Sequence, residues 1–418
     1  MTSGHSTSQH PTSAQPTAPA AQAAPAAPAA PTAPTTPVTV STIGEAMVVL
    51  LPESQRPLAE TRRFDTAIGG AEFNVASSVA RLGVPAHWLS RLGDDGFGEY
   101  VLDVATAAGV LTDAVELDPT RSTGLYIKET VTAEDGSRAP RMHYYRSGSA
   151  ASAIDTAYFR RPESSAVFAA SGIVHTSGIT AALSPDTAAA IADVRAHLTT
   201  GAVLSVDLNY RPRLWAGRTT EPLRRLIEQA DILFLGVDEA EGFFGHADAA
   251  RLFAEFPRLV RIVFKNDAIS AVTAHRADAG AGAGDGTGAG TGAGTPIAVT
   301  SCDVPCLTVD VVETVGAGDA FAAGYLVGLA TGLDDTSCTR IGHATAASTL
   351  ICHGDRPDVV PTPVELRRII DATPAEWSGW SVAPGRRLPW ADTAAPEPAA
   401  AVQTSTAQRT TTQRTMGA

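Results

Sequence analysis

Lysine is almost missing from this sequence. Among 418 residues it occurs only at Lys128 and Lys265, and the other strongly basic residues are arginines. Neither lysine follows a glycine, which excludes a Walker A loop, because the lysine of that loop must reach the β- and γ-phosphates of a nucleotide. With 31 basic and 44 acidic residues, the formal net charge is −13. Such a chain is a poor partner for nucleic acid or for an anionic membrane surface.

Cysteine and long apolar runs are scarce as well. The four cysteines are too few for a disulfide scaffold, and Cys302 and Cys306 lack the second ligand pair that a zinc site needs. No clustered His, Asp and Glu spacing indicates a metal hydrolase. The sequence has no run of about 20 uncharged apolar residues and no signal-peptide pattern at its start. We therefore expect a cytoplasmic protein without a membrane span.

Three segments have a strongly biased composition. Residues 1–37 consist almost entirely of Ala, Pro, Thr, Ser and Gln, and a similar composition returns at 387–418. Both segments are predicted to be disordered tails. Residues 280–295 alternate glycine with small residues, which is typical of a flexible insertion. Between the tails we expect one folded domain, residues 38–386.

Within this domain, short apolar runs alternate with longer amphipathic stretches. Such runs are predicted to be strands at 173–176, 203–207, 232–235 and 262–264. Strands separated by helical stretches indicate βα units and a parallel sheet, in which ligands bind beyond the carboxyl ends of the strands. Residues 38–51 are predicted to form one further strand. Two runs within 124–146 interrupt the rhythm and predict a small antiparallel lid.

The most informative segment runs from Val309 to Phe321. A β-branched strand is predicted to lead into the turn Gly316-Ala317-Gly318-Asp319, and a helix follows. Glycines at such a turn let backbone N–H groups converge on an anion, and the helix N-terminus adds partial positive charge. Asp319 could accept a proton from a hydroxyl group, so the segment suits phosphoryl transfer. Taken alone, the segment is more often a plain turn with a capped helix.

Together with N-terminal motifs, this segment resembles the ribokinase-like (PfkB) family of carbohydrate kinases over nearly all of 38–386. The resemblance rests on residues 313–321, on Gly69 to Ala76, and on 92–98. It implies a three-layer, doubly wound α/β fold with a mostly parallel sheet and a small β-sheet lid, whose strands lie at roughly 45–70 and 120–147.

The resemblance also implies roles for individual residues. Asp319 would be the catalytic base, and the amides of Gly316, Ala317 and Gly318 would hold the γ-phosphate. Lys265, Gly316 and Gly318 would contact the nucleotide. Gly69 and Gly70 would lie against the sugar, because only glycine permits so close an approach of the backbone.

Within the family, the sequence is most similar to the 2-keto-3-deoxygluconate kinases. The similarity lies in residues 44–46, 123–126, 144–152 and 207–215. It implies substrate contacts from Asn74, Tyr126, Tyr144, Arg146 and Arg211. Arginine presents a planar fork of donors, which suits the carboxylate of a sugar acid. The alternative for the two arginines is a structural ion pair, for example with Asp207, and the alternative for the tyrosines is packing within a strand.

Three places depart from the family pattern. Glu313 replaces an aspartate in a region that holds a monovalent cation in some relatives, so such an ion stays an option beside ATP and Mg²⁺. Near residue 236 an asparagine is replaced by glycine, which leaves Glu239 as a magnesium ligand through water. In the loop after Lys265, Asp267 and Ser270 replace two glycines.

These observations favour ATP- and Mg²⁺-dependent phosphorylation of 2-keto-3-deoxygluconate to its 6-phosphate. A PfkB kinase for another sugar, such as fructose, is one alternative. A noncatalytic pseudokinase that binds a sugar acid is another, because of the altered loop. Relatives with a small lid often pair through it, so the resemblance is compatible with a homodimer through the lid.

Overall fold

The computed structural model describes residue 1 and residues 38–53, 57–132, 138–277 and 297–391. The tail predicted at 1–37, the insertion predicted at 280–295 and most of the tail predicted at 387–418 lie outside the described residues. The predicted start of the second tail is too early. Trp390 is fully buried and packs in one cluster with Trp377 and Leu388, so burial of a large aromatic side chain keeps the chain in the fold beyond residue 386.

A large, mostly parallel sheet forms the centre of the fold. Its strand order is β14-β13-β12-β11-β10-β9-β1-β4, and only β13 and β14 run antiparallel to their neighbours. The strands are β1 (Val40–Ile43), β4 (Ala86–Leu89), β9 (Ile173–Ser177), β10 (Val203–Asp207), β11 (Ile232–Gly236), β12 (Arg261–Asn266), β13 (Ser270–Arg276) and β14 (Val299–Pro305). The central strands are covered on both faces, which explains why they read as continuous apolar runs.

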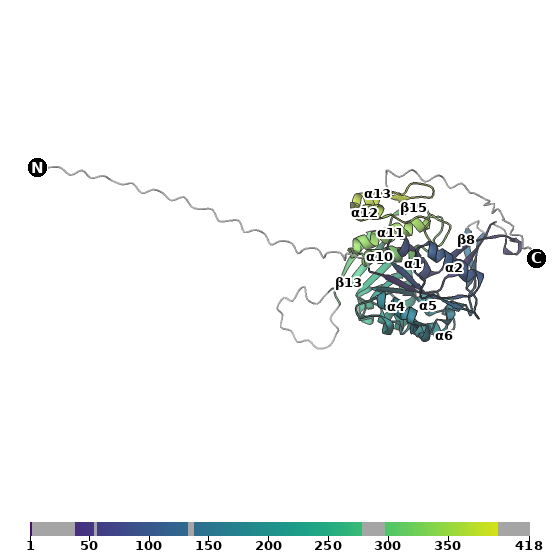
Figure 1. The fold of residues 1–418 in the computed structure, drawn as a ribbon. Coiled ribbons are helices and arrows are strands. Elements are labelled where there is room, and N and C mark those ends of the chain that lie inside the picture. Colours follow the sequence, from purple (N-terminus) through teal and green to yellow (C-terminus); the bar gives the residue numbers. More distant parts are fainter. Residues whose placement is uncertain (2–37, 54–56, 133–137, 278–296, 392–418) are drawn as a thin grey trace, which may run out of the picture. The chain divides into compact units, whose positions relative to one another are not determined.

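Helices cover both faces of this sheet (Figure 1). One layer contains α1 (Ala71–Arg81), α10 (Ala317–Ala330) and α11 (Asp335–Leu350). The opposite layer contains α3 (Thr156–Phe159), α4 (Pro162–Ala170), α5 (Gly178–Ala181), α6 (Pro185–Ile191), α7 (Glu221–Gln229), α8 (Val237–Phe244) and α9 (Ala249–Glu255). The three-layer α/β fold is thus the predicted one.

The remaining elements lie around these layers. They are the helices α2 (Gly96–Ala107), α12 (Pro363–Asp371) and α13 (Pro374–Gly379), and the short 3₁₀ turns Leu58–Glu60, Ala150–Ala153 and Val194–His197. None of the helices in the described part of the chain has the length and apolar character needed to cross a membrane.

The predicted lid is a four-stranded sheet of order β3-β2-β7-β8. It contains β2 (Met47–Pro52), β3 (Phe64–Gly69), β7 (Leu125–Thr132) and β8 (Arg138–Tyr145). The sheet is mixed, because β2 pairs in parallel with β7 and the other pairs are antiparallel. The strand predicted at 38–51 is therefore wrong as one element. Gly44-Glu45-Ala46 carries the chain from β1 in the main sheet to β2 in the lid.

Two small parallel pairs complete the sheets. One joins β5 (Arg91–Gly93) to β6 (Glu116–Asp118), and the other joins β15 (Thr308–Val309) to β16 (Ser381–Val382). The strand predicted to lead into the glycine turn ends at Val309. Val311 and Val312 are exposed, so β-branched residues there do not extend the sheet.

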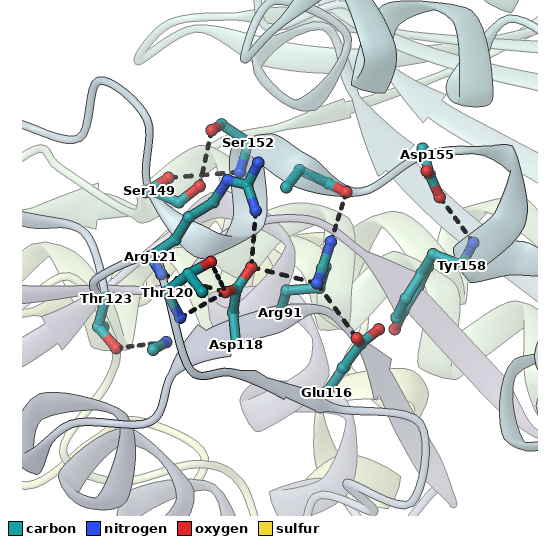
Figure 2. A network of polar contacts seen from close by, with 12 residues as sticks. Arg91, Glu116, Asp118, Thr120, Arg121, Thr123, Ser149, Ser152, Asp155 and Tyr158 are labelled. Atoms are coloured by element: carbon teal, nitrogen blue, oxygen red, sulfur yellow. Dashed lines mark hydrogen bonds and ion pairs between the residues drawn. The ribbon is translucent and has the colours of Figure 1, made fainter.

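A polar network fixes the chain just before and after the lid hairpin. Figure 2 shows Arg91 between Glu116 and Asp118, and Asp118 also accepts hydrogen bonds from Thr120 and Arg121. Burial would raise the pKa of the Asp118 carboxyl, but hydrogen bonds from the Thr120 hydroxyl, from the N–H groups of Thr120 and Arg121 and from the Arg121 guanidinium hold it well below the usual range. This network anchors the segment that leads into β7.

Candidate functional site

The main cavity lies at the carboxyl ends of the parallel strands, the usual ligand position in open α/β sheets. Its volume is about 1110 Å³. The ends of β10, β11 and β12 contribute one lining residue each, namely Asp207, Gly236 and Lys265. The lid contributes Tyr126 and Tyr144. The turn before α10 lines it as well, so strands, lid and helix N-terminus meet around one space.

The turn Gly316-Ala317-Gly318 opens the 14-residue helix α10 towards this cavity. Gly316 has φ 83°, a left-handed conformation that favours glycine. A Cβ added there would overlap the backbone carbonyl of Asp355. The first N–H groups of a helix have no intrahelical acceptor, so the turn presents donors where an anion can bind.

Asp319 lies in the first turn of α10. Its Oδ2 accepts a hydrogen bond of 2.8 Å from Nδ2 of Asn74, on α1. Burial raises the pKa of Asp319 to about 7, and the charges of Asp207 and Glu72 act in the same direction, while Asn74 and Lys265 oppose them. A carboxyl group that titrates near neutral pH is suited to accept a proton.

Lys265 faces the same turn from the end of β12. Its Nζ lies 2.7 Å from Oδ2 of Asp207 and would be 3.5 Å from a Cβ on Gly318. Burial alone would lower the pKa of Lys265, but the carboxylates of Asp207 and Glu239 outweigh it and raise that pKa. Lys265 is therefore a charged ammonium group beside the anion-binding turn.

The altered loop after Lys265 keeps a backbone conformation typical of glycine. Asp267 has φ 44°, and aspartate enters the left-handed region more readily than most residues. Replacement of a glycine by Asp267 therefore preserves the turn. Lys265, Asp267 and Ser270 all still line the cavity.

Glu239, the predicted magnesium ligand, lies on the cavity wall at the start of α8. Oε2 accepts the N–H of Gly236 at 3.1 Å, and Oε1 accepts the N–H of Tyr210. Burial and the nearby charge of Asp207 raise the pKa of Glu239. Both oxygens are thus engaged by backbone donors.

Several buried polar atoms on the cavity wall have no hydrogen-bond partner among the described residues. They are Oδ1 of Asn74, Oδ1 of Asp207 and Oδ1 of Asn209. Asn209 also has φ 37°, an uncommon conformation for a residue other than glycine. Buried polar groups normally have partners, so these atoms indicate a site that a polar ligand completes.

The two arginines predicted to contact the substrate differ in their surroundings. Arg146 forms an ion pair with the buried Glu45, whose Oε1 accepts a hydrogen bond from Ser149. Arg146 therefore has an ion-pair partner, as the alternative interpretation predicts, and it also lines the cavity. Arg211 is exposed, lines the cavity and forms no ion pair with any residue that the structure describes.

The tyrosines of the lid and the two glycines before α1 also differ in whether they face the cavity or contact other protein groups. Tyr144 is 55% exposed, and its ring centroid lies 5.4 Å from that of Tyr126. Tyr126 donates to Oδ2 of Asp355. Gly70 lines the cavity, whereas a side chain at Gly69 would overlap Tyr126 and Asp355. The close approach at Gly69 is thus to protein groups.

Sequence reasoning did not select Glu45, Asp207 or Asn209 as site residues. Each lies within a segment that carried the resemblance, at 44–46 or 207–215, so those segments held the available signal. Asp355 lies in the loop after α11 and borders the cavity. Nothing in the local sequence distinguishes it from other loop aspartates.

Comparison with known sequences agrees with this geometry. A family model described as pfkB family carbohydrate kinase matches residues 39–363. The 2-dehydro-3-deoxygluconokinase of Bacillus subtilis (strain 168) is 31% identical over 339 residues, which cover 79% of this chain and 95% of that protein. The 2-dehydro-3-deoxygalactonokinase of Haloferax volcanii is 29% identical over 333 residues, with the same two coverages of 79% and 95%.

Solved structures share the architecture. The PfkB protein from Polaromonas sp. JS666 has a TM-score of 0.62 at 30% identity and covers 79% of this chain and 99% of its own. The fructokinase with bound ATP from Xylella fastidiosa has a TM-score of 0.62 at 25% identity, covering 79% and 98%. These likenesses confirm the predicted ribokinase-like α/β fold.

Proposed function

The chain belongs to the pfkB family of carbohydrate kinases, and we propose that it phosphorylates a sugar acid, 2-keto-3-deoxygluconate, at its terminal hydroxyl with ATP as donor. The observation that carries this proposal is the position of Asp319. Its carboxyl, with a pKa of about 7, lies beside an anion-binding turn and the ammonium group of Lys265 in one cavity.

In the proposed reaction, Asp319 accepts the proton of the substrate hydroxyl as that oxygen attacks the γ-phosphorus in line. Asn74 holds the carboxylate through Oδ2, and its unpaired Oδ1 is available to the sugar. The amides of Gly316, Ala317 and Gly318 receive the transferred phosphoryl group, and Lys265 adds positive charge beside them. Phosphoryl transfer depends mainly on such positioning and charge stabilisation.

The chain also offers carboxylates of the kind that Mg²⁺ bound to ATP requires. Asp207 has a buried Oδ1 without a hydrogen-bond partner among the described residues. Its charge lies close enough to the Glu239 carboxylate to add to the effect of burial, and together they raise the pKa of Glu239. Mg²⁺ usually keeps several waters and uses one or two carboxylates together with substrate phosphates. We infer that Asp207, and Glu239 through water, hold the ion, which when bound neutralises phosphate charge.

Arg211 supports an acidic substrate. Its guanidinium is unpaired among the described residues and borders the cavity, whereas the charge of Arg146 is matched by Glu45. A carboxylate suits the planar fork of donors on an arginine. We infer that Arg211 binds the substrate carboxylate and that Arg146, held by Glu45, shapes the wall beside it. The two curated relatives above are named for such acids.

A coupled assay of ADP release across a sugar panel tests this function. The panel contains 2-keto-3-deoxygluconate, 2-keto-3-deoxygalactonate, 5-keto-2-deoxygluconate and fructose. We expect the highest kcat/KM for 2-keto-3-deoxygluconate. Because a charge-assisted hydrogen bond contributes about 1.5–3 kcal/mol, Arg211→Leu is expected to raise KM for the acids about 10- to 150-fold.

Arg213→Leu is the matched control, because Arg213 is an exposed arginine two residues away that does not line the cavity. It is expected to keep wild-type values. A preference for fructose over all three acids would contradict recognition of a carboxylate. Binding of a sugar acid without ATP binding or turnover would identify the protein as a noncatalytic binder.

The pH profile tests the pair of Asn74 and Asp319. Since a general base must be deprotonated, kcat is expected to fall about tenfold per pH unit below the pKa of Asp319, which is about 7. The Asn74 amide stabilises the charged carboxylate, so Asn74→Ala raises this pKa and moves the acidic limb to higher pH. Asn266→Ala alters another asparagine of the cavity wall and should leave the limb in place. An unshifted limb in Asn74→Ala would show that the hydrogen bond does not set the pKa.

A further inference from the structure

A buried charge cluster joins the lid to the loops beside the anion-binding turn. Lys128, on β7, is 7% exposed, and its Nζ lies 2.7 Å from Oε2 of Glu313 and 3.6 Å from Oδ1 of Asp355. Tyr126, two residues earlier on β7, donates to Oδ2 of Asp355. Residues two apart share one face of a strand, so one face of the lid strand engages both acids.

The two acids hold the chain on either side of the turn. Oε1 of Glu313 accepts the N–H groups of Thr314 at 3.1 Å and Val315 at 3.4 Å. The backbone of Asp355 packs directly against Gly316, where it leaves no room for a Cβ. The residues that lead into the turn are therefore held by Glu313, and the turn itself rests on Asp355.

The charge balance explains why a cation is needed at this point. The side chains of Glu313 and Asp355 are only 14% and 7% exposed, and two buried carboxylates with no cation between them would repel each other. A buried ion pair of this kind contributes little net stability, because desolvation offsets the attraction. Its effect is on the relative position of the groups that it joins.

We propose that Lys128 is a positioning residue for phosphoryl transfer. Its ammonium group holds Glu313 and Asp355 together, and this sets the backbone of residues 314–316 so that the amides of the turn face the γ-phosphate. The inference rests on the proposed function, since it assigns the γ-phosphate to that turn. An ammonium group supplied by the chain also replaces an added monovalent cation at Glu313.

The test compares two nucleotides that differ in the γ-phosphate. Calorimetry with Mg²⁺ measures Kd for AMP-PNP and for ADP in the wild type and in Lys128→Met, which keeps chain length and removes the charge. We expect the affinity for AMP-PNP to fall about tenfold, the size of one charge-assisted contact, while the affinity for ADP is retained. The kcat should fall by a similar factor, with KM for the sugar unchanged.

Two further variants make the test specific. Glu129→Gln is the control, because Glu129 is the next residue on β7 and pairs instead with His143 at 2.9 Å; it should match the wild type. If Lys128→Met does not fold, Lys128→Met combined with Glu313→Gln removes one cation and one carboxylate and so preserves the net charge of the cluster. It should show the same selective loss.

A charge-specific rescue separates positioning from a general loss of structure. Lys128→Ala leaves space for a small cation, so ammonium chloride should restore part of its kcat, while choline chloride at equal ionic strength should not. Wild-type kcat should not respond to either salt. Rescue by both salts or by neither would contradict the proposal.

The nucleotide measurement keeps this inference separate from the proposed function. If the wild type phosphorylates no sugar in the panel but Lys128→Met selectively loses AMP-PNP affinity, the substrate proposal fails and the role of Lys128 stands. An unchanged ratio of the two Kd values in the variant, or an equal loss for both nucleotides, overturns the role of Lys128. A wild type that binds neither nucleotide overturns both.

Discussion

Asp319→Asn is expected to lower kcat by about 10²–10⁴-fold, the usual contribution of a general base, while the protein keeps its fold. The side chain that replaces the carboxylate has the same shape and cannot accept the proton of the substrate hydroxyl. Burial raises the pKa of Asp319 to about 7 in the folded state, above the value of about 3.9 for an unfolded aspartate. The carboxyl therefore lowers stability progressively from about pH 4 and fully above about pH 7. The variant should therefore unfold at the same temperature as the wild type or at a higher one at pH 8.

Asp186→Asn is the matched control for this variant. Asp186 is also the acidic residue in the first turn of a helix, α6, but it is exposed and does not line the cavity. Its replacement removes the same charge from a helix N-terminus and should leave kcat unchanged. Near-normal turnover of Asp319→Asn, measured with saturating ATP and sugar acid, would exclude Asp319 as the base.

Gly316→Ala has the second largest expected effect. A left-handed conformation costs an L-residue about 1–2 kcal/mol, and the new Cβ would also overlap the carbonyl of Asp355. The turn must move, and its amides then no longer face the transferred phosphoryl group. We expect kcat to fall about 10²–10³-fold, as when a donor to a developing charge is lost, together with a lower melting temperature.

Gly354→Ala provides the comparison for Gly316→Ala. Gly354 lies next to Asp355, has no positive φ, and its nearest atom to an added Cβ is 3.9 Å away. This substitution should change neither kcat nor the melting temperature. Wild-type kcat in Gly316→Ala would show that the backbone of this turn does not stabilise the transferred group.

The fold class could be predicted because its signals are local. The apolar run at β11 is buried on both faces of the main sheet, and such a run is visible in the sequence. The signal for the turn at Gly316 is local as well, because a glycine directly before a run of small helix-forming residues is visible in the sequence. In the structure Gly316 has φ 83° and precedes α10. The ends of the folded domain are harder to predict from the sequence, because they depend on long-range packing. Trp390 belongs to the fold only because it packs against residues far from it in the sequence.

Charge pairing was the part of the site that sequence reasoning could not predict. Arg146 is predicted at the substrate and lines the cavity, but its ion pair with Glu45, which lies much earlier in the chain, is not visible in the sequence. Asp207, named only as an example of an acid that could pair with an arginine, pairs with Lys265. A sequence lists the charges, but it does not say which two the fold brings within a few ångströms of each other.

The two lysines show which properties the sequence determines and which depend on the tertiary structure. By itself the sequence determined that no Walker A lysine exists, that a glycine turn opens a helix, and that Asp319 stands at that turn, because each of these is a matter of neighbouring residues. Only the tertiary structure decided where the two lysines act. Lys265 lies beside Gly318, and Lys128 lies between Glu313 and Asp355, because ion pairs form between groups that are close in space and distant in the chain.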